Sequence, residues 1–430
     1  MLTNIAAVIV TWNNKKAVLS LLETLAKISY PHFTVFLVDN ASTDGTSEAV
    51  MSLYPDVNLL RNNENLGGAG GFNTGIEQII AQEKFEFVWL LDNDVEVDPM
   101  SLTYLLETLS NNPNAAVCGS RIARAGTNVI QECGGYIDWH RCDTRLNRRD
   151  EIDDPILDLI EQVDFCPACS MLVRIEDIKK FGSFDSEMFV FWDDIEFCTR
   201  LKNQGRTILC DLRSRVVHSF HGDKPEEPWR IYYYIRNALY FIYYHYPNKN
   251  KNKGVSKYLY IAYQKLMLYK LLGANELAAA VHIGIHDFFK GIRGRQDIET
   301  MLRKNSKIDE GRNEDLNGID MIIQIGHKSS ETIESKIKAC KIFIWKKTLS
   351  LPAKIKIIIK IITKKSIIIS NRVHIIMLFS KINCLVKTNG YVLSNNRKRN
   401  ALLYIINLIR LRYKYCCGRY PNVTISQKKL

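Results

Sequence analysis

A cluster of acidic side chains follows a short apolar run in the first quarter of the chain. The run at residues 87–91 (FVWLL) has the length of a buried strand and is too short for a typical helix. Asp92, Asn93 and Asp94 follow at its carboxyl end, where open α/β sheets bind their ligands. Two carboxylates one residue apart suit Mg²⁺ or Mn²⁺, which bridge protein carboxylates to substrate phosphates. The alternative is a polar turn that merely closes the strand.

The segments before this cluster have the pattern of a parallel α/β sheet. Residues 5–12 and 33–38 are predicted strands, and residues 15–26 between them have helical spacing. Strand–helix–strand order is the start of a doubly wound fold. Asp39 ends the second strand, where an acidic residue can accept hydrogen bonds from a nucleoside. For Asp44 we prefer a role in capping the next helix.

A glycine-rich run lies between the strands that end at Asp39 and Asp92. Residues 66–75 (LGGAGGFNTG) predict a loop, followed by a helix at residues 76–81 whose N-terminus suits a phosphate group. The spacing fits neither the dinucleotide-binding fingerprint nor the Walker loop. Its place between two carboxylate-tipped strands favours a role in binding phosphate.

A second acidic cluster follows aromatic residues at 189–197 (FVFWDDIEF). A carboxylate among aromatic side chains is partly desolvated, which raises its pKa and suits it to accept a proton from a hydroxyl group. The alternative is an acidic first turn of a helix, favoured by the helix dipole. We prefer this alternative for Glu196.

These segments, taken in order, resemble the family 2 glycosyltransferases of the GT-A fold, in the style of their rhamnosyltransferase and galactofuranosyltransferase branch. The resemblance rests on VIVTWNN, FLVDNASTDGT, NENLGGAGGFNTGI, WLLDNDVEVDP and FVFWDDIEFCTRLKNQGRTILCDLRSRVVH, and it spans residues 5–240. It implies a Rossmann-like mixed α/β sheet and an inverting transfer of a sugar from a nucleotide-diphosphate donor. The donors to test first are UDP-galactofuranose, dTDP-rhamnose and a UDP-hexose.

The resemblance also implies roles for individual residues. Asp194 would be the catalytic base, with Asp193 as the runner-up. The cation, Mn²⁺ or Mg²⁺, would be held by Asp92, Asp94 and His218, with His221 as a fallback ligand. The acceptor side would comprise Trp192, Asp193 and Arg236. The nucleotide-sugar site would comprise Thr11, Asp39, Asn65, Gly67, Asn73, Asp92 and Asn93.

The charge of the chain is unevenly distributed. The 430 residues carry a net charge of +12, yet residues 318–430 hold 23 Lys and Arg against 3 Asp and Glu, so the remainder is net acidic. We predict a GT-A catalytic domain at 1–230, a helical extension at 231–300, a linker at 301–317 and a small basic α/β domain at 318–430.

The basic C-terminal region indicates an anionic partner. Candidates are an anionic membrane surface and a glycan or lipid-diphosphate-linked acceptor. Nucleic acid ranks last because no nucleic-acid module is recognised, and we expect none as a partner. A compositional bias toward Lys and Ile is the plainer explanation. Association into a homo-oligomer is left open.

The remaining features concern location and rival functions. No apolar run is long enough to span a membrane, and the N-terminus lacks the marks of a secretion signal. We therefore expect a cytoplasmic protein, peripheral at the inner face of the cell membrane, that helps to make a surface polysaccharide such as capsule or O-antigen. The 11 cysteines then read as reduced thiols, and a metal role for the CPAC pair lacks a second half. The rivals are a sugar nucleotidyltransferase and a non-catalytic nucleotide-sugar-binding assembly subunit.

Overall fold

The structure is a computed structural model that describes residues 3–154, 157–219, 226–247 and 251–303, with two paired strands, β13 (Lys387–Thr388) and β14 (Tyr391–Val392). The described residues divide into two compact units. The first consists of residues 3–258 and 284–296 and contains the whole candidate site; the second contains residues 259–283 and continues from residue 297. The first unit thus extends past residue 230, where the sequence placed the end of the catalytic domain.

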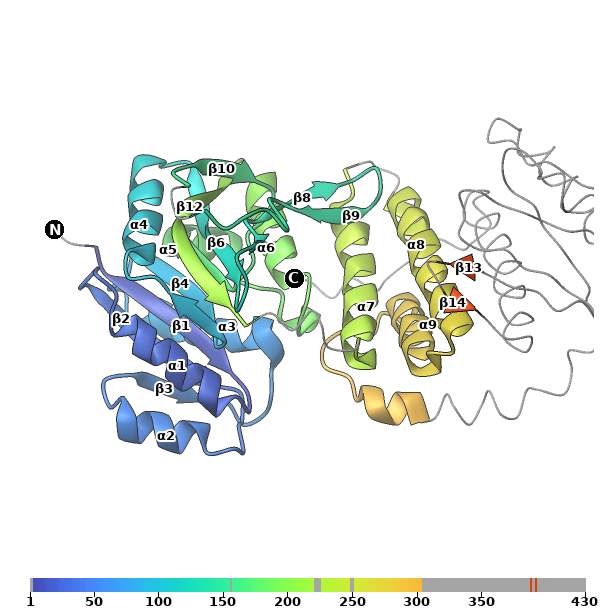
Figure 1. Ribbon diagram of the computed structural model, residues 1–430, viewed down its shortest axis with the longest axis horizontal. Coiled ribbons are helices and arrows are strands. Elements are labelled where there is room, and N and C mark those ends of the chain that lie inside the picture. The colour runs from blue at the N-terminus through green and yellow to red at the C-terminus, as the bar shows by residue number, and fades with distance from the viewer. Residues whose placement is uncertain are drawn as a thin grey trace, which may run out of the picture. The chain divides into compact units, whose positions relative to one another are not determined.

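A mixed β-sheet lies at the centre of the first unit (Figure 1). Its strands are β1 (Ile5–Thr11), β2 (Phe33–Asp39), β3 (Asn58–Arg61), β4 (Phe87–Asp92), β5 (Val95–Val97), β6 (Ala115–Arg124), β7 (Ile130–Glu132), β10 (Ile160–Val163), β11 (Ser170–Arg174) and β12 (Thr207–His218). The order is β10-β12-β6-β11-β4-β1-β2-β3, with β5 paired to β12 and β7 to β6. Strands β1 to β4 are parallel, as predicted, whereas β11 lies antiparallel between β4 and β6.

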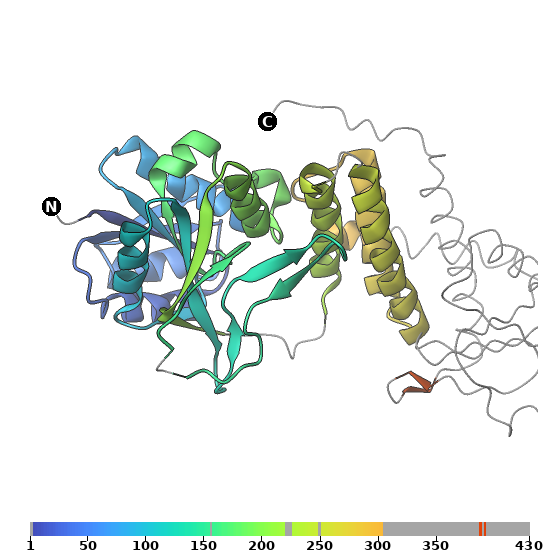
Figure 2. The same ribbon diagram turned by 90° about the horizontal axis from the view of Figure 1, so that it is seen from above.

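Helices cover both faces of the sheet, as the two views of Figures 1 and 2 show. One layer consists of α1 (Lys15–Leu25), α2 (Thr46–Leu53) and α4 (Ser101–Asn111), and the other of α3 (Gly67–Ala81), α5 (Ile175–Phe181) and α6 (Asp193–Asn203). Successive strand residues point to opposite faces. On β1, Ala6 and Val8 therefore pack in the α3 layer, and Ile5, Ala7 and Ile9 in the α1 layer.

The glycine run forms the first turns of α3, so the prediction of a loop before a helix at residue 76 was wrong. Glycine is a poor helix former, but here it allows the helix to lie directly against β1. A Cβ atom on Gly71 or Gly75 would lie 2.5 Å from a methyl carbon of Val10 or Val8. Packing against the sheet therefore outweighs the local preference.

Further elements complete the described part of the chain: the hairpin β8 (Gly135–Asp138) and β9 (Asp143–Leu146), the 3₁₀ turn η1 (Ser186–Met188), α7 (Pro228–His245), α8 (Lys251–Leu272) and α9 (Asn275–Lys290). Tyr232, Tyr233 and Tyr240 of α7 are buried. The hydroxyl group of Tyr232 donates to Oδ2 of Asp287 at 2.7 Å.

Other predictions have mixed outcomes. The seven cysteines of the described residues are buried and free, as expected for reduced thiols. Among the described residues, no helix combines the length and the apolar character that crossing a bilayer requires. His221 lies outside the described residues, and so does the predicted domain at 318–430 apart from the four residues of β13 and β14.

Candidate active site

Strand pairing brings the ends of β4 and β12 together, although they are far apart in the chain. Strand β5 begins one residue after Asp94 and pairs antiparallel with the end of β12, which places Val95 opposite His218. The N–H of Ser219 also donates to the carbonyl oxygen of Asp94 at 3.1 Å. Strand β12 continues through an irregularity in its pairing with β6, between Asp211 and Arg215.

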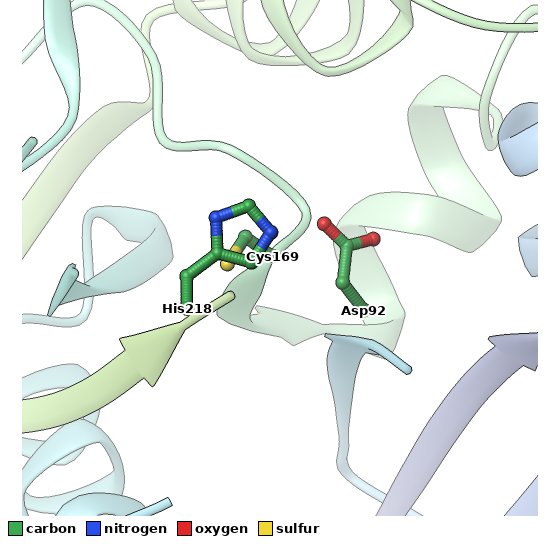
Figure 3. A group of neighbouring side chains, drawn as sticks. All are labelled: Asp92, Cys169 and His218. Atoms are coloured by element: carbon green, nitrogen blue, oxygen red, sulfur yellow. The ribbon is translucent and has the colours of Figure 1, made fainter. Parts of the chain in front are cut away.

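The three predicted metal ligands lie at this junction, and a cysteine joins them. Nε2 of His218 lies 3.2 Å from Oδ1 of Asp94. Asp92, Cys169 and His218 each offer one ligand atom, and these atoms all lie within 4.8 Å of one another. Figure 3 shows the Asp92 carboxylate facing the imidazole. Carboxylate, imidazole and thiol groups that converge in this way suit a divalent cation.

Two side chains of β7, those of Gln131 and Glu132, form a hydrogen-bonded chain with the Nδ1 side of His218. Nδ1 of His218 lies 3.0 Å from Oε1 of Gln131, and Nε2 of Gln131 donates to Glu132 at 3.3 Å. When Nδ1–H donates to Gln131, the Nε2 atom is directed to the carboxylates, as a ligating histidine requires. No local pattern in the sequence marks these residues. They reach the site because β7 pairs with β6, the parallel neighbour of β12.

Buried carboxyl groups repel one another at this junction. Burial, together with the charges of Asp94 and Asp194, raises the pKa of Asp92 to about 6, against the opposing effect of His218. Burial likewise raises the pKa of Glu132 to about 7. For His218, burial opposes protonation, but the hydrogen bond to Asp94 and the nearby negative charges outweigh it and raise the pKa. A bound cation would relieve this repulsion.

The loop before α6 has an unusual backbone conformation. Three of its residues have positive φ angles (65°, 63° and 68°), which few residues other than glycine adopt: Phe189, Phe191 and Trp192. The Asn237 amide donates to three backbone carbonyl oxygens here, those of Met188, Val190 and Phe191, at 2.7, 2.8 and 3.1 Å. Such strain persists where the surroundings impose it, commonly at functional sites. Here it delivers Asp193 and Asp194 to the first turn of α6.

The two aspartates of α6 differ in their surroundings. Asp193 is 8% exposed, and burial together with the charge of Asp194 raises its pKa well above the usual range. Asp194 is partly exposed and accepts the N–H of Ile195 at 2.7 Å; desolvation raises its pKa to about 6. A general base must be reached by its substrate and be ionised at the working pH. Asp194 meets both conditions better than Asp193.

The start of α3 lies directly against this loop. Gly67 has a φ of 74°, and a Cβ atom there would lie 2.0 Å from the carbonyl oxygen of Phe189. A Cβ atom on Gly68 would lie 3.7 Å from Oδ2 of Asp193. Asn65 accepts the N–H of Gly67 at 2.8 Å and so orders the first turn. The glycine run therefore borders the acidic cluster, as the proposed phosphate-binding role requires.

Thr11 and Asn93, two residues of the predicted nucleotide-sugar site, lie beside the predicted metal ligands. Nδ2 of Asn93 donates to Oγ1 of Thr11 at 2.9 Å, and Nδ2 of Asn14 donates to Oδ1 of Asn93 at 3.1 Å. This chain of hydrogen bonds ties together the carboxyl ends of β1 and β4. Asn14 was not among the predicted residues, although it lies in the turn that follows β1.

Asp39 and Asp44 order the loop after β2. The fully buried Asp39 carboxylate accepts the N–H of Ser42 at 2.8 Å and the hydroxyl group of Ser47. Asp44 accepts the N–H of Thr46, the first residue of α2, at 3.1 Å, although Gly45 and not Asp44 occupies the N-cap position. Contact between Asp39 and a nucleoside remains a prediction.

Three of the predicted binding residues make hydrogen bonds or packing contacts within the protein. Asn73 clamps the loop after α5 with hydrogen bonds of 2.6, 2.8 and 3.1 Å. Trp192 is 2% exposed and packs against Phe241, with ring centroids 5.1 Å apart. Arg236 is fully buried, and it donates to the carbonyl oxygen of Gly294 at 2.7 Å. Packing thus encloses the side chains of Trp192 and Arg236, and their contact with an acceptor stays a prediction.

The mixed sheet, with carboxylates and a histidine at its strand ends and an acidic helix start beside them, has the architecture of the GT-A fold. Residues 6–174 match the family model described as "Glycosyl transferase family 2". This part of the chain is a family 2 glycosyltransferase domain.

Two curated proteins and one solved structure are similar to parts of the chain. The chain is 28% identical over 207 residues to N-acetylglucosaminyl-diphospho-decaprenol L-rhamnosyltransferase of Mycobacterium tuberculosis, a match that covers 43% of this chain and 66% of that protein. It is 27% identical over 206 residues to the O-antigen biosynthesis protein RfbC of Myxococcus xanthus, covering 45% of this chain and 15% of that protein. The crystal structure of TarS 1-349 of S. aureus aligns with a TM-score of 0.44 at 16% identity, over 74% of this chain and 94% of that one. The chain thus spans just under two thirds of the rhamnosyltransferase and much less of RfbC.

Proposed function

We propose that the protein is an inverting, metal-dependent glycosyltransferase that moves a sugar from a nucleotide-diphosphate donor to a hydroxyl group of a glycan or lipid-linked acceptor. The observation that carries the proposal is the meeting of Asp92, Asp94 and His218 through the pairing of β5 with β12. These residues lie where the ends of β4 and β12 meet, close enough to Asp194 for its charge to raise the pKa of Asp92.

Each group has a distinct task in this proposal. Asp92, Asp94 and His218 would hold Mn²⁺ or Mg²⁺, which supplies positive charge to stabilise the departing nucleoside diphosphate. Thr11, Asn93 and the start of α3 border the donor. Asp194 takes the proton of the acceptor hydroxyl group. The acceptor oxygen bonds to the anomeric carbon of the donor sugar as the bond between that carbon and the diphosphate breaks.

The donor and acceptor follow by analogy. The rhamnosyltransferase relative makes dTDP-rhamnose the first donor to test, with UDP-galactofuranose and a UDP-hexose beside it. The same relative's name makes a lipid-diphosphate-linked sugar the first acceptor to test. The basic residues of 318–430 would hold such an acceptor, or an anionic membrane surface, at the inner face of the cell membrane.

The test is a pair of variants that remove one carboxylate each with little change in volume. Asp194→Asn should lower the transfer rate by at least about a hundredfold, the usual contribution of a general base. Affinity for the nucleotide sugar with Mn²⁺, measured by thermal shift, should be nearly unchanged. Asp193→Asn is the matched control and should retain more activity. Equal loss of binding and transfer in Asp194→Asn would reject its assignment as the base.

Two other outcomes would reject the proposal as a whole. Release of pyrophosphate from a nucleoside triphosphate and a sugar phosphate would identify a nucleotidyltransferase. Tight binding of a nucleotide sugar without hydrolysis or transfer, with every donor and acceptor tried, would identify a non-catalytic assembly subunit.

A further inference from the structure

Cys169 lies at the junction of β4 and β12, where the proposed function has no use for a thiol. Its Sγ atom belongs to the group of ligand atoms, with those of Asp92 and His218, that lie within 4.8 Å of one another. Figure 3 shows the three side chains converging from separate segments of the chain. The arrangement combines sulfur, nitrogen and oxygen ligands.

The position of Cys169 is fixed by strand register. Ser170 lies opposite Leu91 in the antiparallel pair of β11 and β4, so that the preceding residue lies opposite Asp92. The N–H of Asp92 donates to the carbonyl oxygen of Cys169 at 3.2 Å, which continues the pairing by one residue. The thiol is thus held at the junction by the backbone of the sheet, and it is 5% exposed.

The ligand set favours a softer cation than the proposed reaction needs. Mg²⁺ and Mn²⁺ prefer carboxylate and phosphate oxygens, whereas Zn²⁺ binds thiolate, imidazole and carboxylate together in tetrahedral sites. A fourth ligand is at hand, because Oδ1 of Asp94 lies 3.2 Å from Nε2 of His218. In a tetrahedral site with zinc–ligand bonds of about 2.0 to 2.3 Å, ligand atoms lie roughly 3.3 to 3.8 Å apart. The three groups lie within 4.8 Å of one another, so small side-chain movements bring them to that spacing.

We infer that Asp92, Cys169 and His218 form a zinc-binding site that overlaps the proposed catalytic cation site, so that Zn²⁺ inhibits the enzyme by displacing the catalytic ion. In the zinc-bound state the cation is enclosed by protein ligands, and fewer positions remain for a diphosphate oxygen. Zn²⁺ also binds such sites more tightly than Mn²⁺ does in general. The inference shares Asp92 and His218 with the proposed function, but its test requires no turnover.

The experiment is a titration of the full-length protein with Co²⁺ as a spectroscopic substitute for Zn²⁺. The wild-type protein should develop a near-ultraviolet thiolate-to-cobalt charge-transfer band that Zn²⁺ removes by competition. Cys169→Ser should lack the band and bind Zn²⁺ more weakly by about tenfold or more, because loss of a direct ligand costs at least as much as loss of an outer partner. Cys142→Ser, which alters another buried thiol, is the matched control and should behave as wild type.

Several results would overturn the inference. These are a charge-transfer band that persists in Cys169→Ser, the absence of a band in the wild-type protein, or Zn²⁺ binding no tighter than Mn²⁺ binding. If Cys169→Ser does not fold, X-ray absorption of the zinc-loaded wild-type protein decides, because a thiolate ligand places sulfur at about 2.3 Å from the metal. A cobalt–thiolate band together with no transfer to any acceptor would support the zinc site and reject the proposed function.

Discussion

Replacement of Gly67 by alanine tests whether contact with α3 positions the proposed base. A Cβ atom at this position would lie 2.0 Å from the carbonyl oxygen of Phe189, whereas ordinary contacts begin at 3.4 Å. The loop carbonyl must therefore retreat by more than an ångström, and the same loop leads into Asp194 at the start of α6. A misplacement of about 1 Å can lower a rate by about a hundredfold.

The matched control is Gly205→Ala. Gly205 has a φ of 82°, close to the 74° of Gly67, but nothing lies within 4 Å of a Cβ atom placed there. Both variants bear the cost of a left-handed alanine, about 1 to 2 kcal/mol of unfolding free energy. Gly67→Ala adds an overpacking cost of about 1 to 3 kcal/mol.

The assays are urea unfolding followed by circular dichroism, and turnover of the nucleotide sugar with Mn²⁺. Gly205→Ala should lose stability only. Gly67→Ala should lose more stability, and its turnover should fall by about a hundredfold under conditions in which it remains folded. If the two variants turn over donor equally fast, the contact between α3 and the loop does not position Asp194, and the reasoning fails.

Two other predictions concern residues around the proposed cation site. The pKa of Asp194 is raised to about 6, and a base acts only when ionised, so kcat/KM should fall about tenfold per pH unit below a midpoint at or below about 6. A pH profile that is flat down to pH 4, or one that Asp194→Asn retains, would contradict this. Gln131→Leu removes the acceptor for Nδ1–H of His218 and should weaken Mn²⁺ binding, measured by electron paramagnetic resonance, by about ten- to a hundredfold. The exposed Gln162→Leu should leave Mn²⁺ binding unchanged, and equal affinities of the two variants would show that Gln131 does not orient the imidazole.

Sequence reasoning located the parts of the fold that depend on local pattern. The apolar strands that end at Asp39 and Asp92 have clear boundaries, and the parallel order of β1 to β4 follows from strand–helix–strand connection. The sequence prediction placed the start of α3 too late because glycine has a low helix propensity. The glycines are nevertheless helical here, since they allow α3 to pack closely against β1. Local preference and packing disagree there, and packing decides.

The supporting residues of the site could not be predicted in the same way. Cys169 reaches Asp92 only because β11 lies antiparallel beside β4, and Gln131 reaches His218 only because β7 pairs with β6. Both relations depend on strand order across the second half of the sheet, which no short pattern encodes. The burial of Trp192 and Arg236 could not be predicted either, because it depends on contacts with α7 and with the chain after α9.

The pairing of β5 with β12 has a consequence during synthesis of the protein. A ribosome completes β4 and β5 long before it reaches β12, so a nascent chain carries both carboxylates for some time without their imidazole partner. An incomplete chain therefore has the two mutually repelling carboxylates but not the complete proposed cation site. On the proposed mechanism, the protein would bind the cation and turn over a nucleotide sugar only after His218 has been synthesised and β12 has paired with β5.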